Sequence, residues 1–377
     1  MFKVGYVQGN ESRVSHASLF TAMYPAEHKF IAEKAKLNKD FVTLPEAIKP
    51  TGHTTVGFMG NGFIDAFWGF GEGWDLLKNH IHDGGGLRAA DLRQAAQTWL
   101  NVNIMKPFFL YIGTIDAHVS WRAHEPWIAK YDPEPYVGPF VKACLDPQLD
   151  NIVAGKMKIN DRDKKRIEAL YDSDVSYNDQ QFGELIKYLQ SKGHLDDTMI
   201  VLLADHGDEM YEHGKIGHGQ SLHEELVHIP FVISYPPLFP PGKEVDEGVE
   251  LIDVMPTILD ALDGKLPADA QGESLVPLAQ GQGAGYPRPA IASQYELAHT
   301  MRLGRWKLWV GGSGEVKLID AASDPLGRTE LENDHPYERR FVTDALSLWM
   351  AYQSKWHKTR WGVASNLKPA FAADLDR

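Results

Sequence analysis

Residues 199–230 contain an unusual concentration of side chains that can do chemistry. The stretch reads MIVLLADHGDEMYEHGKIGHGQSLHEELVHIP. Its five apolar residues, 199–203, predict a strand buried on both faces, and Asp205 and His206 follow directly. Open α/β sheets bind ligands at the carboxyl ends of their strands. A carboxylate beside an imidazole therefore predicts a divalent-metal site, with a solvated loop of incidental histidines as the alternative.

A second strand also ends in an acid and a histidine. Residues 108–112 (FFLYI) predict a buried strand, and Asp116 and His118 follow it closely. Because strand ends of an α/β sheet meet at one edge, we expect both segments to contribute to one site. The alternative for His118 is a histidine satisfied within the core.

A serine-rich segment near the start of the chain predicts a helix terminus. Residues 12–25 read SRVSHASLFTAMYP, and either Ser12 or Ser15 can cap a short helix whose buried face carries Leu19, Phe20 and Met23. A hydroxyl at a helix start lies beside free backbone N–H groups, which favour anionic substrates. The alternative is that Ser12 is only a capping or turn serine.

The spacing of apolar residues and the positions of Gly and Pro predict the helices and strands that carry these residues. The strongest helix is predicted over 164–192, and an insertion with several prolines is expected at 131–160. From residue 290 onward the pattern indicates an antiparallel meander. The other expected elements are a short edge strand within 1–7, strands at 54–59 and 229–235, and helices at 89–100 and 338–356.

Composition bounds the class of protein. The chain has 377 residues and a formal net charge of −13, which argues against nucleic acid as a partner. Its single cysteine, Cys144, excludes an internal disulfide, and we expect it to be buried. No run approaches the roughly 18 apolar residues of a membrane span, so none is expected. Localisation and oligomeric state do not follow from the sequence.

These motifs together resemble the sulfatase branch of the alkaline phosphatase superfamily. The family's second signature is similar to residues 204–230 of this chain, which read ADHGDEMYEHG, then KI, then GHGQSLHEELVHIP. Residues 12–25 resemble the family's first signature. The resemblance implies a nucleophile at Ser12 and metal ligands at Asp205 and His206. It also implies catalytic roles for His118 and His218, the latter within Gly-His-Gly, and substrate contacts from His16 and Asp116.

The resemblance carries expectations for the whole chain. It implies a three-layer alkaline-phosphatase-like α/β sandwich over residues 1–285, and a small antiparallel subdomain with a helix over 286–377. The implied activity is metal-dependent hydrolysis of sulfate esters on a small molecule or a glycan. Ca²⁺ is the ion that the family implies first, and Mg²⁺, Mn²⁺ or Zn²⁺ are compatible with the same residues.

Two departures from the family pattern keep alternatives open. Conversion of a serine to formylglycine requires a small residue two positions later and an Arg four positions later. The segment Ser12-Arg13-Val14-Ser15-His16 has Val14 and His16 there, so we expect Ser12 to be unmodified. That favours a phosphodiester or phosphonate hydrolase, or a phosphoryl-group transferase, as the rival activity. The family also begins with a strand ending in Asp ligands, whereas residues 1–11 contain no Asp. We therefore expect weak hydrolysis and an open strand edge, with a truncated, impaired or purely binding homologue as the further alternative.

Overall fold

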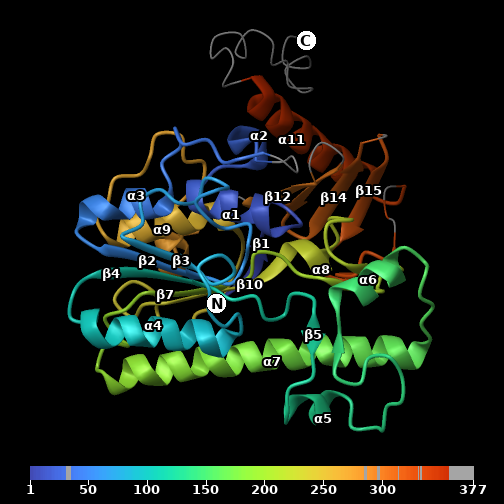
Figure 1. The fold of residues 1–377 in the computed structure, drawn as a ribbon. Coiled ribbons are helices and arrows are strands. Elements are labelled where there is room, and N and C mark those ends of the chain that lie inside the picture. Colours follow the sequence, from blue (N-terminus) through green and yellow to red (C-terminus); the bar gives the residue numbers. More distant parts are fainter. Residues whose placement is uncertain are drawn as a thin grey trace, which may run out of the picture. The chain divides into compact units, whose positions relative to one another are not determined.

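The computed structural model describes residues 1–30, 35–283, 287–294, 298–312, 314–329, 331 and 333–355, whose helices and strands are labelled in Figure 1. The chain divides into two compact units. The first unit comprises residues 1–44, 200–207 and 218–377, and the second comprises 45–199 and 208–217. The expected division into residues 1–285 and 286–377 stays a prediction.

The first unit combines two four-stranded sheets with helices. Its elements are β1 (Phe2–Tyr6), α1 (Ser12–Thr21), α2 (Pro25–His28), β7 (Ile200–Leu203), α8 (Glu224–Val227), β10 (His228–Ser234), β11 (Val245–Glu250), η2 (Leu251–Asp253), α9 (Val254–Ala261), α10 (Val276–Ala279), β12 (Pro289–Gln294), β13 (Ala298–Leu303), β14 (Trp306–Gly311), β15 (Val316–Asp320) and α11 (Pro336–Lys355).

Strand β1 lies inside its sheet, so the expectation of an edge strand was wrong. The strand order is β11-β1-β10-β7, and β1 pairs in parallel with β11 and antiparallel with β10. A Cβ on Gly5 would come within 2.7 Å of the Phe231 Cβ on β10, so glycine permits the close approach of these strands. The flanking strands lie more than 200 residues away in sequence, which is why local periodicity could not reveal them.

Strand β7 precedes Asp205 and His206 in the chain and lies at the end of this sheet. It pairs with β10 through Ile200 to Leu203, and its four residues are partly exposed. The expectation of a strand buried on both faces was therefore wrong. Within the described residues β7 pairs only with β10, and the expectation that a missing first strand leaves an open edge stays a prediction.

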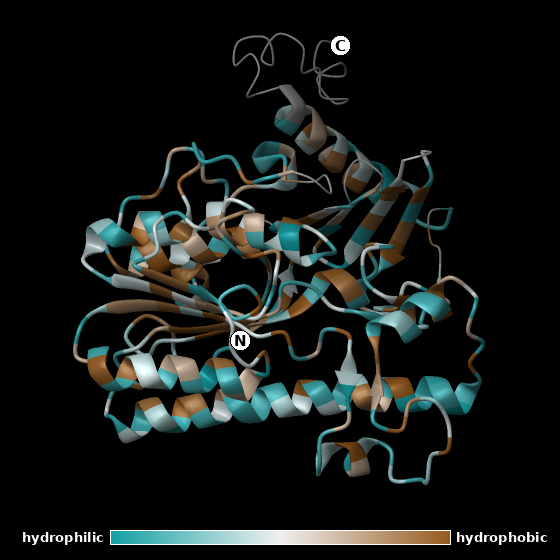
Figure 2. Cartoon of the chain, viewed as in Figure 1, coloured by the Kyte–Doolittle hydropathy of each residue, from teal (hydrophilic) through white to brown (hydrophobic). Residues whose placement is uncertain are grey.

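The C-terminal meander is confirmed. Strands β12 to β15 pair antiparallel in chain order, and α11 packs on them. Their common core contains Ile291, Met301 and Leu308 from the sheet and Val342 and Leu346 from the helix. Figure 2 shows hydrophilic and hydrophobic residues alternating around α11, as expected for a helix with one face on a sheet.

The second unit is built on a parallel sheet of order β3-β2-β4. Its elements are α3 (Leu44–Ile48), whose first residue belongs to the first unit, η1 (Lys49–Thr51), β2 (Thr54–Met59), β3 (Leu76–Asn79), α4 (Ala89–Asn103), β4 (Phe108–Gly113), β5 (Trp121–Arg122), α5 (Trp127–Tyr131), β6 (Ala143–Cys144), α6 (Asp146–Val153), α7 (Asp161–Ser191), β8 (Glu209–Met210) and β9 (Ile216–Gly217).

Helices α4 and α7 confirm the two clearest helix predictions. Leu92 and Ala96 of α4 pack on Val56 and Phe58 of β2. Helix α7 begins at a capping box in which the Asn160 side chain accepts from the Asp163 backbone N–H. The insertion expected at 131–160 contains β6 and α6, and Cys144 is buried in it as predicted.

Among the residues described, no helix is both long and apolar enough to cross a bilayer.

A buried carboxyl group gives the first unit a pH-dependent stability. Glu250, at the end of β11, accepts hydrogen bonds from Gln8 Nε2 at 3.0 Å, the Tyr24 hydroxyl at 2.6 Å and the Ile291 backbone N–H at 2.8 Å. Burial and the neighbouring Asp253 carboxylate raise the pKa of Glu250 to about 8, although these hydrogen bonds oppose the shift. The folded chain therefore holds this proton more tightly than the unfolded chain.

We predict that the free energy of unfolding falls as the pH rises from about 4.5 toward 8. The raised pKa contributes stability below the unfolded value of 4.5, and this contribution is lost as the pH passes through the folded value. Glu250→Gln, which keeps the polar shape without the charge, should flatten this slope and stabilise the protein at pH 8 by a few kcal/mol. Urea denaturation at several pH values measures it. The exposed Glu244→Gln variant should keep the wild-type slope, and an unchanged slope in Glu250→Gln would refute the assignment.

Candidate functional site

The first unit brings Ser12, Asp205 and His206 together. Helix α1 begins at Ser12, so this serine lies in the first turn, and Glu11 occupies the cap position without a side-chain hydrogen bond. Asp205 and His206 follow the end of β7. The Ser12 Oγ lies 3.3 Å from His206 Nε2, and His206 Nε2 lies 3.8 Å from Asp205 Oδ2. A helix start and a strand end thus meet at one point.

The backbone fixes the orientation and the tautomer of His206. Its Nδ1 donates to the Gly207 carbonyl oxygen at 3.0 Å, so Nε2 presents a lone pair toward Ser12. A Cβ on Gly207 would collide with the Glu225 carbonyl oxygen, so glycine is required at this turn. The Asp-His-Gly order in the sequence therefore has a steric reason as well as a chemical one.

His16 lies one helical turn after Ser12 and supports the same corner. Its Nδ1 lies 2.7 Å from the Ser12 carbonyl oxygen and 3.5 Å from Asp205 Oδ2. Burial lowers the pKa of His16 against the opposing pull of Asp205, which favours the neutral ring. The geometry places His16 beside the predicted ligand, and its expected contact with substrate stays a prediction.

Asp205 remains ionised in this environment. Burial by itself raises the pKa of a carboxyl group, but the imidazoles of His206 and His16 and the hydroxyl of Ser12 hold the pKa of Asp205 below its ordinary value. An ionised carboxylate is the form that binds a cation.

The donor atoms of Ser12, Asp205 and His206 are of the kinds that can bind a divalent ion. The Ser12 hydroxyl has one proton, whereas it faces two acceptors, Asp205 Oδ2 and His206 Nε2. The remaining lone pairs repel one another, and a cation between them relieves that repulsion. Ligand atoms that share one ion at about 2.0–2.5 Å are roughly 3–4 Å apart, which matches the observed separations of 3.3 and 3.8 Å.

His218 joins this group through its ring. The ring centroids of His218 and His206 are 4.4 Å apart. Gly217 and Gly219, on either side, have φ values of +83° and +87°, which residues with a Cβ rarely adopt. Gln294 Nε2 donates to the Gly219 carbonyl oxygen at 2.7 Å and holds the turn on β12.

Sequence reasoning missed the buried charges that anchor the following loop. Lys307, on β14, donates to Glu224 Oε1 at 2.6 Å and to the Leu222 carbonyl oxygen at 2.8 Å. The Tyr6 hydroxyl donates to the same carboxylate at 2.5 Å, and Arg302 lies 3.3 Å from it. Burial opposes ionisation of Glu224, but Lys307 and the other donors hold its pKa below the ordinary value. A lysine within the apolar run WKLWV was the available sign.

The second unit contains the other two predicted residues, His118 and Asp116. The loop after β4 turns at Ala117, which has a φ of +76°, and His118 Nδ1 lies 2.5 Å from the Val119 carbonyl oxygen. Asp116 Oδ1 accepts from Arg88 Nη1 at 2.9 Å, and Asp116 Oδ2 accepts from the Ala89 backbone N–H at the start of α4. Asp116 therefore holds this loop to α4, and its predicted contact with substrate stays a prediction.

A polar network continues from Asp116 to α7. Asp116, His124 and Asp174 have potential ligand atoms within 4.8 Å of one another. Hydrogen bonds already engage them, because His124 Nε2 lies 2.7 Å from Asp174 Oδ1 and the Arg122 backbone N–H donates to Asp174 Oδ2 at 2.6 Å. Burial raises the pKa of both carboxyl groups against the pull of their cationic neighbours. We interpret the group as a structural network.

Known protein families and relatives resemble this chain in sequence. The sulfatase family model matches residues 1–264, and the model described as N-sulphoglucosamine sulphohydrolase, C-terminal, matches residues 212–340. An arylsulfatase of Clostridium perfringens is 29% identical over 248 residues, covering 62% of this chain and 51% of the relative. The multifunctional alkaline phosphatase superfamily protein PehA of Trinickia caryophylli is 31% identical over 213 residues, covering 50% and 41%.

Solved structures share the fold. A protein in complex with its substrate D-glucosamine-2-N,6-O-disulfate aligns with a TM-score of 0.76 at 18% identity, covering 95% of this chain and 91% of that chain. The phosphonate monoester hydrolase of Agrobacterium radiobacter aligns with a TM-score of 0.75 at 18% identity, covering 93% and 88%. The α/β fold expected from the sequence is thereby confirmed.

This chain matches only part of each curated relative. The chain spans 51% and 41% of the length of the two curated relatives named above. The sulfatase family model nevertheless covers more than two thirds of this chain, including the segments that carry Ser12, Asp205 and His206. The chain belongs to the sulfatase family of the alkaline phosphatase superfamily.

Proposed function

We propose that this protein hydrolyses sulfate esters with Ser12 as nucleophile. The observation that carries the proposal is the meeting of Ser12, Asp205 and His206, in which one hydroxyl faces two acceptors. The two acceptors can take up the serine proton. The alkoxide that remains is the reactive form of the nucleophile. The backbone N–H groups at the start of α1 favour an anionic ester beside it.

Each of the other residues has a proposed role. Ser12 Oγ bonds to sulfur, and the bond from sulfur to the leaving oxygen breaks. His218, beside His206, donates a proton to that leaving oxygen, and this proton is replaced by the one that Ser12 loses. A water molecule then attacks the sulfur, the bond from sulfur to Ser12 Oγ breaks, and one proton of the water returns to Ser12 Oγ as sulfate leaves. His118 is proposed to contribute to the same proton transfer or to bind an ester oxygen, and His16 and Asp116 to support substrate binding.

Asp205 and His206 are the proposed ligands of a divalent ion, with Ca²⁺ first and Mg²⁺, Mn²⁺ or Zn²⁺ as alternatives. When bound, such an ion lowers the pKa of a neighbouring hydroxyl and neutralises charge on the ester oxygens. Asp205, His206 and Ser12 supply three donor atoms, whereas Ca²⁺ takes six to eight oxygen ligands. Water and substrate oxygens can occupy the remaining positions.

We propose a sulfated sugar as the substrate class. The match to the C-terminal model of N-sulphoglucosamine sulphohydrolase and the fold shared with a protein bound to a disulfated glucosamine support it. The proposed roles of the site residues concern the ester group, and they leave the identity of the sugar open.

The second candidate is hydrolysis of phosphonate or phosphate diesters. Val14 and His16 occupy the positions where formylglycine conversion requires a small residue and an arginine, and an unmodified serine suits phosphoryl transfer. The fold shared with a phosphonate monoester hydrolase is compatible with this candidate.

We predict that Asp205→Ala abolishes stoichiometric binding of a divalent ion while the fold remains. The carboxylate supplies the only formal negative charge among the three donors, and it is a ligand rather than a packing group. Metal content after dialysis and the shift of the melting temperature with added CaCl₂ measure this. Asp246→Ala, at an exposed position, is the control. Stoichiometric ion binding by Asp205→Ala would reject Asp205 as a ligand.

We predict that residue 12 of the purified protein is serine. The conversion pattern is broken at Val14 and His16. Mass spectrometry of a peptide that spans residue 12 should give the mass of unmodified serine. A peptide lighter by two hydrogens would mean that conversion occurs despite these residues, and would remove the argument for the phosphonate candidate.

We predict that Ser12→Ala lowers turnover by about three powers of ten or more, because no other group replaces the nucleophile. Ser15→Ala, on the same helix, is the matched control, since Ser15 Oγ bonds to the Gly9 carbonyl oxygen. Aryl sulfate and bis-aryl phosphodiester should be assayed side by side with each metal. Preference for the phosphodiester would favour the second candidate, and equal rates in Ser12→Ala and wild type would exclude Ser12 from both.

A further inference from the structure

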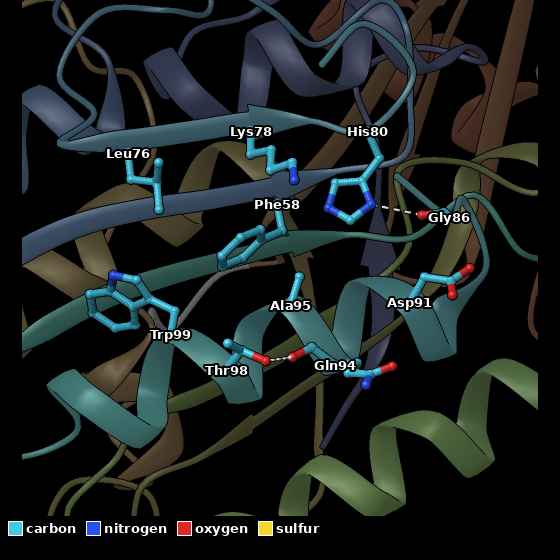
Figure 3. A pocket seen from close by; sticks show the side chains of 10 residues that line it. All are labelled: Phe58, Leu76, Lys78, His80, Gly86, Asp91, Gln94, Ala95, Thr98 and Trp99. Atoms are coloured by element: carbon cyan, nitrogen blue, oxygen red, sulfur yellow. Dashed lines mark hydrogen bonds between the residues drawn. The ribbon is translucent and has the colours of Figure 1, made fainter. Parts of the chain in front are cut away.

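The second unit contains a pocket that no proposed step uses. It lies between strands β2 and β3 and helix α4, with a volume of about 530 Å³ (Figure 3). Small-molecule sites commonly measure about 300–1,000 Å³. Phe58 and Trp99 provide aromatic surface, Lys78 and His80 lie together at one end, and Gln94 and Thr98 line the side formed by α4.

His80 presents an unsatisfied acceptor to this pocket. The side chain is only 5% exposed, and its Nδ1 donates to the Gly86 carbonyl oxygen at 2.7 Å. Nε2 therefore carries a lone pair, and it has no hydrogen-bond partner among the residues that the structure describes. In Figure 3, Nε2 is on the side of the ring that faces Lys78 and Phe58. Leaving a buried acceptor unpaired costs about 1–3 kcal/mol, so a ligand hydroxyl is favoured there.

The loop after β3 is built to hold His80 in this orientation. A Cβ on Gly85 would lie 2.6 Å from His80 Nδ1, and a Cβ on Gly86 would collide with the Asp91 carboxylate. The glycines thus let the loop fold closely around the ring and deliver the Gly86 carbonyl to Nδ1. The His80 ring packs edge-on against the Phe58 ring, with ring centroids 6.4 Å apart (Figure 3).

Lys78 adds a single positive charge beside this acceptor. In the described part of the chain no ion pair engages its ammonium group, although the protein as a whole is acidic. Farther along the pocket, the Trp99 ring is held edge-on to Phe108, with ring centroids 6.0 Å apart. One cation, one acceptor and an aromatic surface suit a ligand with one carboxylate, a hydroxyl and an apolar face.

We propose that this pocket binds a sugar acid of the hexuronate class. Its carboxylate pairs with Lys78, a ring hydroxyl donates to His80 Nε2, and its C–H face packs on the aromatic side chains. The nearby Asp91 carboxylate disfavours ligands with two or more negative charges on one group, such as phosphate monoesters. This proposal does not rest on the hydrolytic activity proposed above, and it is tested by binding alone.

Isothermal titration of the full chain with D-glucuronate tests it, with D-glucose and benzoate as probes that lack the carboxylate or the hydroxyls. A monosaccharide acid should bind with a dissociation constant of about 1 mM, given its few non-hydrogen atoms. Lys78→Met should weaken binding at least about tenfold, whereas Lys106→Met, at an exposed position outside the pocket, should not.

A second variant examines His80 without disturbing its loop. In His80→Asn the amide nitrogen can still donate to the Gly86 carbonyl oxygen while Nε2 is deleted, and its melting temperature reports whether the fold is kept. Binding should weaken in a folded His80→Asn, and in wild type the ¹⁵N resonance of His80 Nε2 should shift on titration. No binding at 20-fold the expected constant, equal binding of glucose or benzoate, or equal losses in Lys78→Met and Lys106→Met would each overturn the proposal.

Discussion

The first unit depends on a buried ion pair between Glu224 and Lys307. It joins helix α8 to strand β14, and Tyr6 from the central strand β1 donates to the same carboxylate. Burying two charges is costly, but removing one partner of such a pair leaves an uncompensated charge and commonly costs about 3–5 kcal/mol. Arg302 on β13 contacts the Glu224 carboxylate as well, so three strands, β1, β13 and β14, are held by one carboxylate on α8.

The same ion pair is connected to the loop that carries part of the candidate site. Lys307 also donates to the Leu222 carbonyl oxygen, and Asn10 donates to the Ser221 carbonyl oxygen at 2.6 Å. The segment before Ser12 and the loop after His218 are therefore tied to one framework. Rigid support of this kind matters because nucleophile and leaving-group residues act only within a few tenths of an ångström of their productive positions.

At the candidate site there is a shortage of protons, because the hydrogen-bond acceptors around Ser12 outnumber the donors. Nδ1 of His206 is committed to a backbone carbonyl, Asp205 is held ionised, and Ser12 has a single proton for two acceptors. Converging lone pairs are unfavourable in isolation and favourable around a cation. The same shortage appears in the second unit, where His80 Nε2 is buried without a donor among the described residues. In both places an unsatisfied acceptor indicates what a ligand must supply.

The sequence by itself determined the helices α4, α7 and α11, because each depends on local periodicity, and it carries the motifs that resemble the sulfatase family. The roles of Ser12, Asp205, His206 and His218 are implied by that resemblance and stay predictions. Tertiary structure alone decided that β1 lies inside its sheet, that Asp116 is occupied by Arg88, and that Lys307 neutralises Glu224. These features join residues tens to hundreds of positions apart. Local patterns record which face of an element is apolar, whereas the partner of a buried charge or strand is set only when distant segments pack.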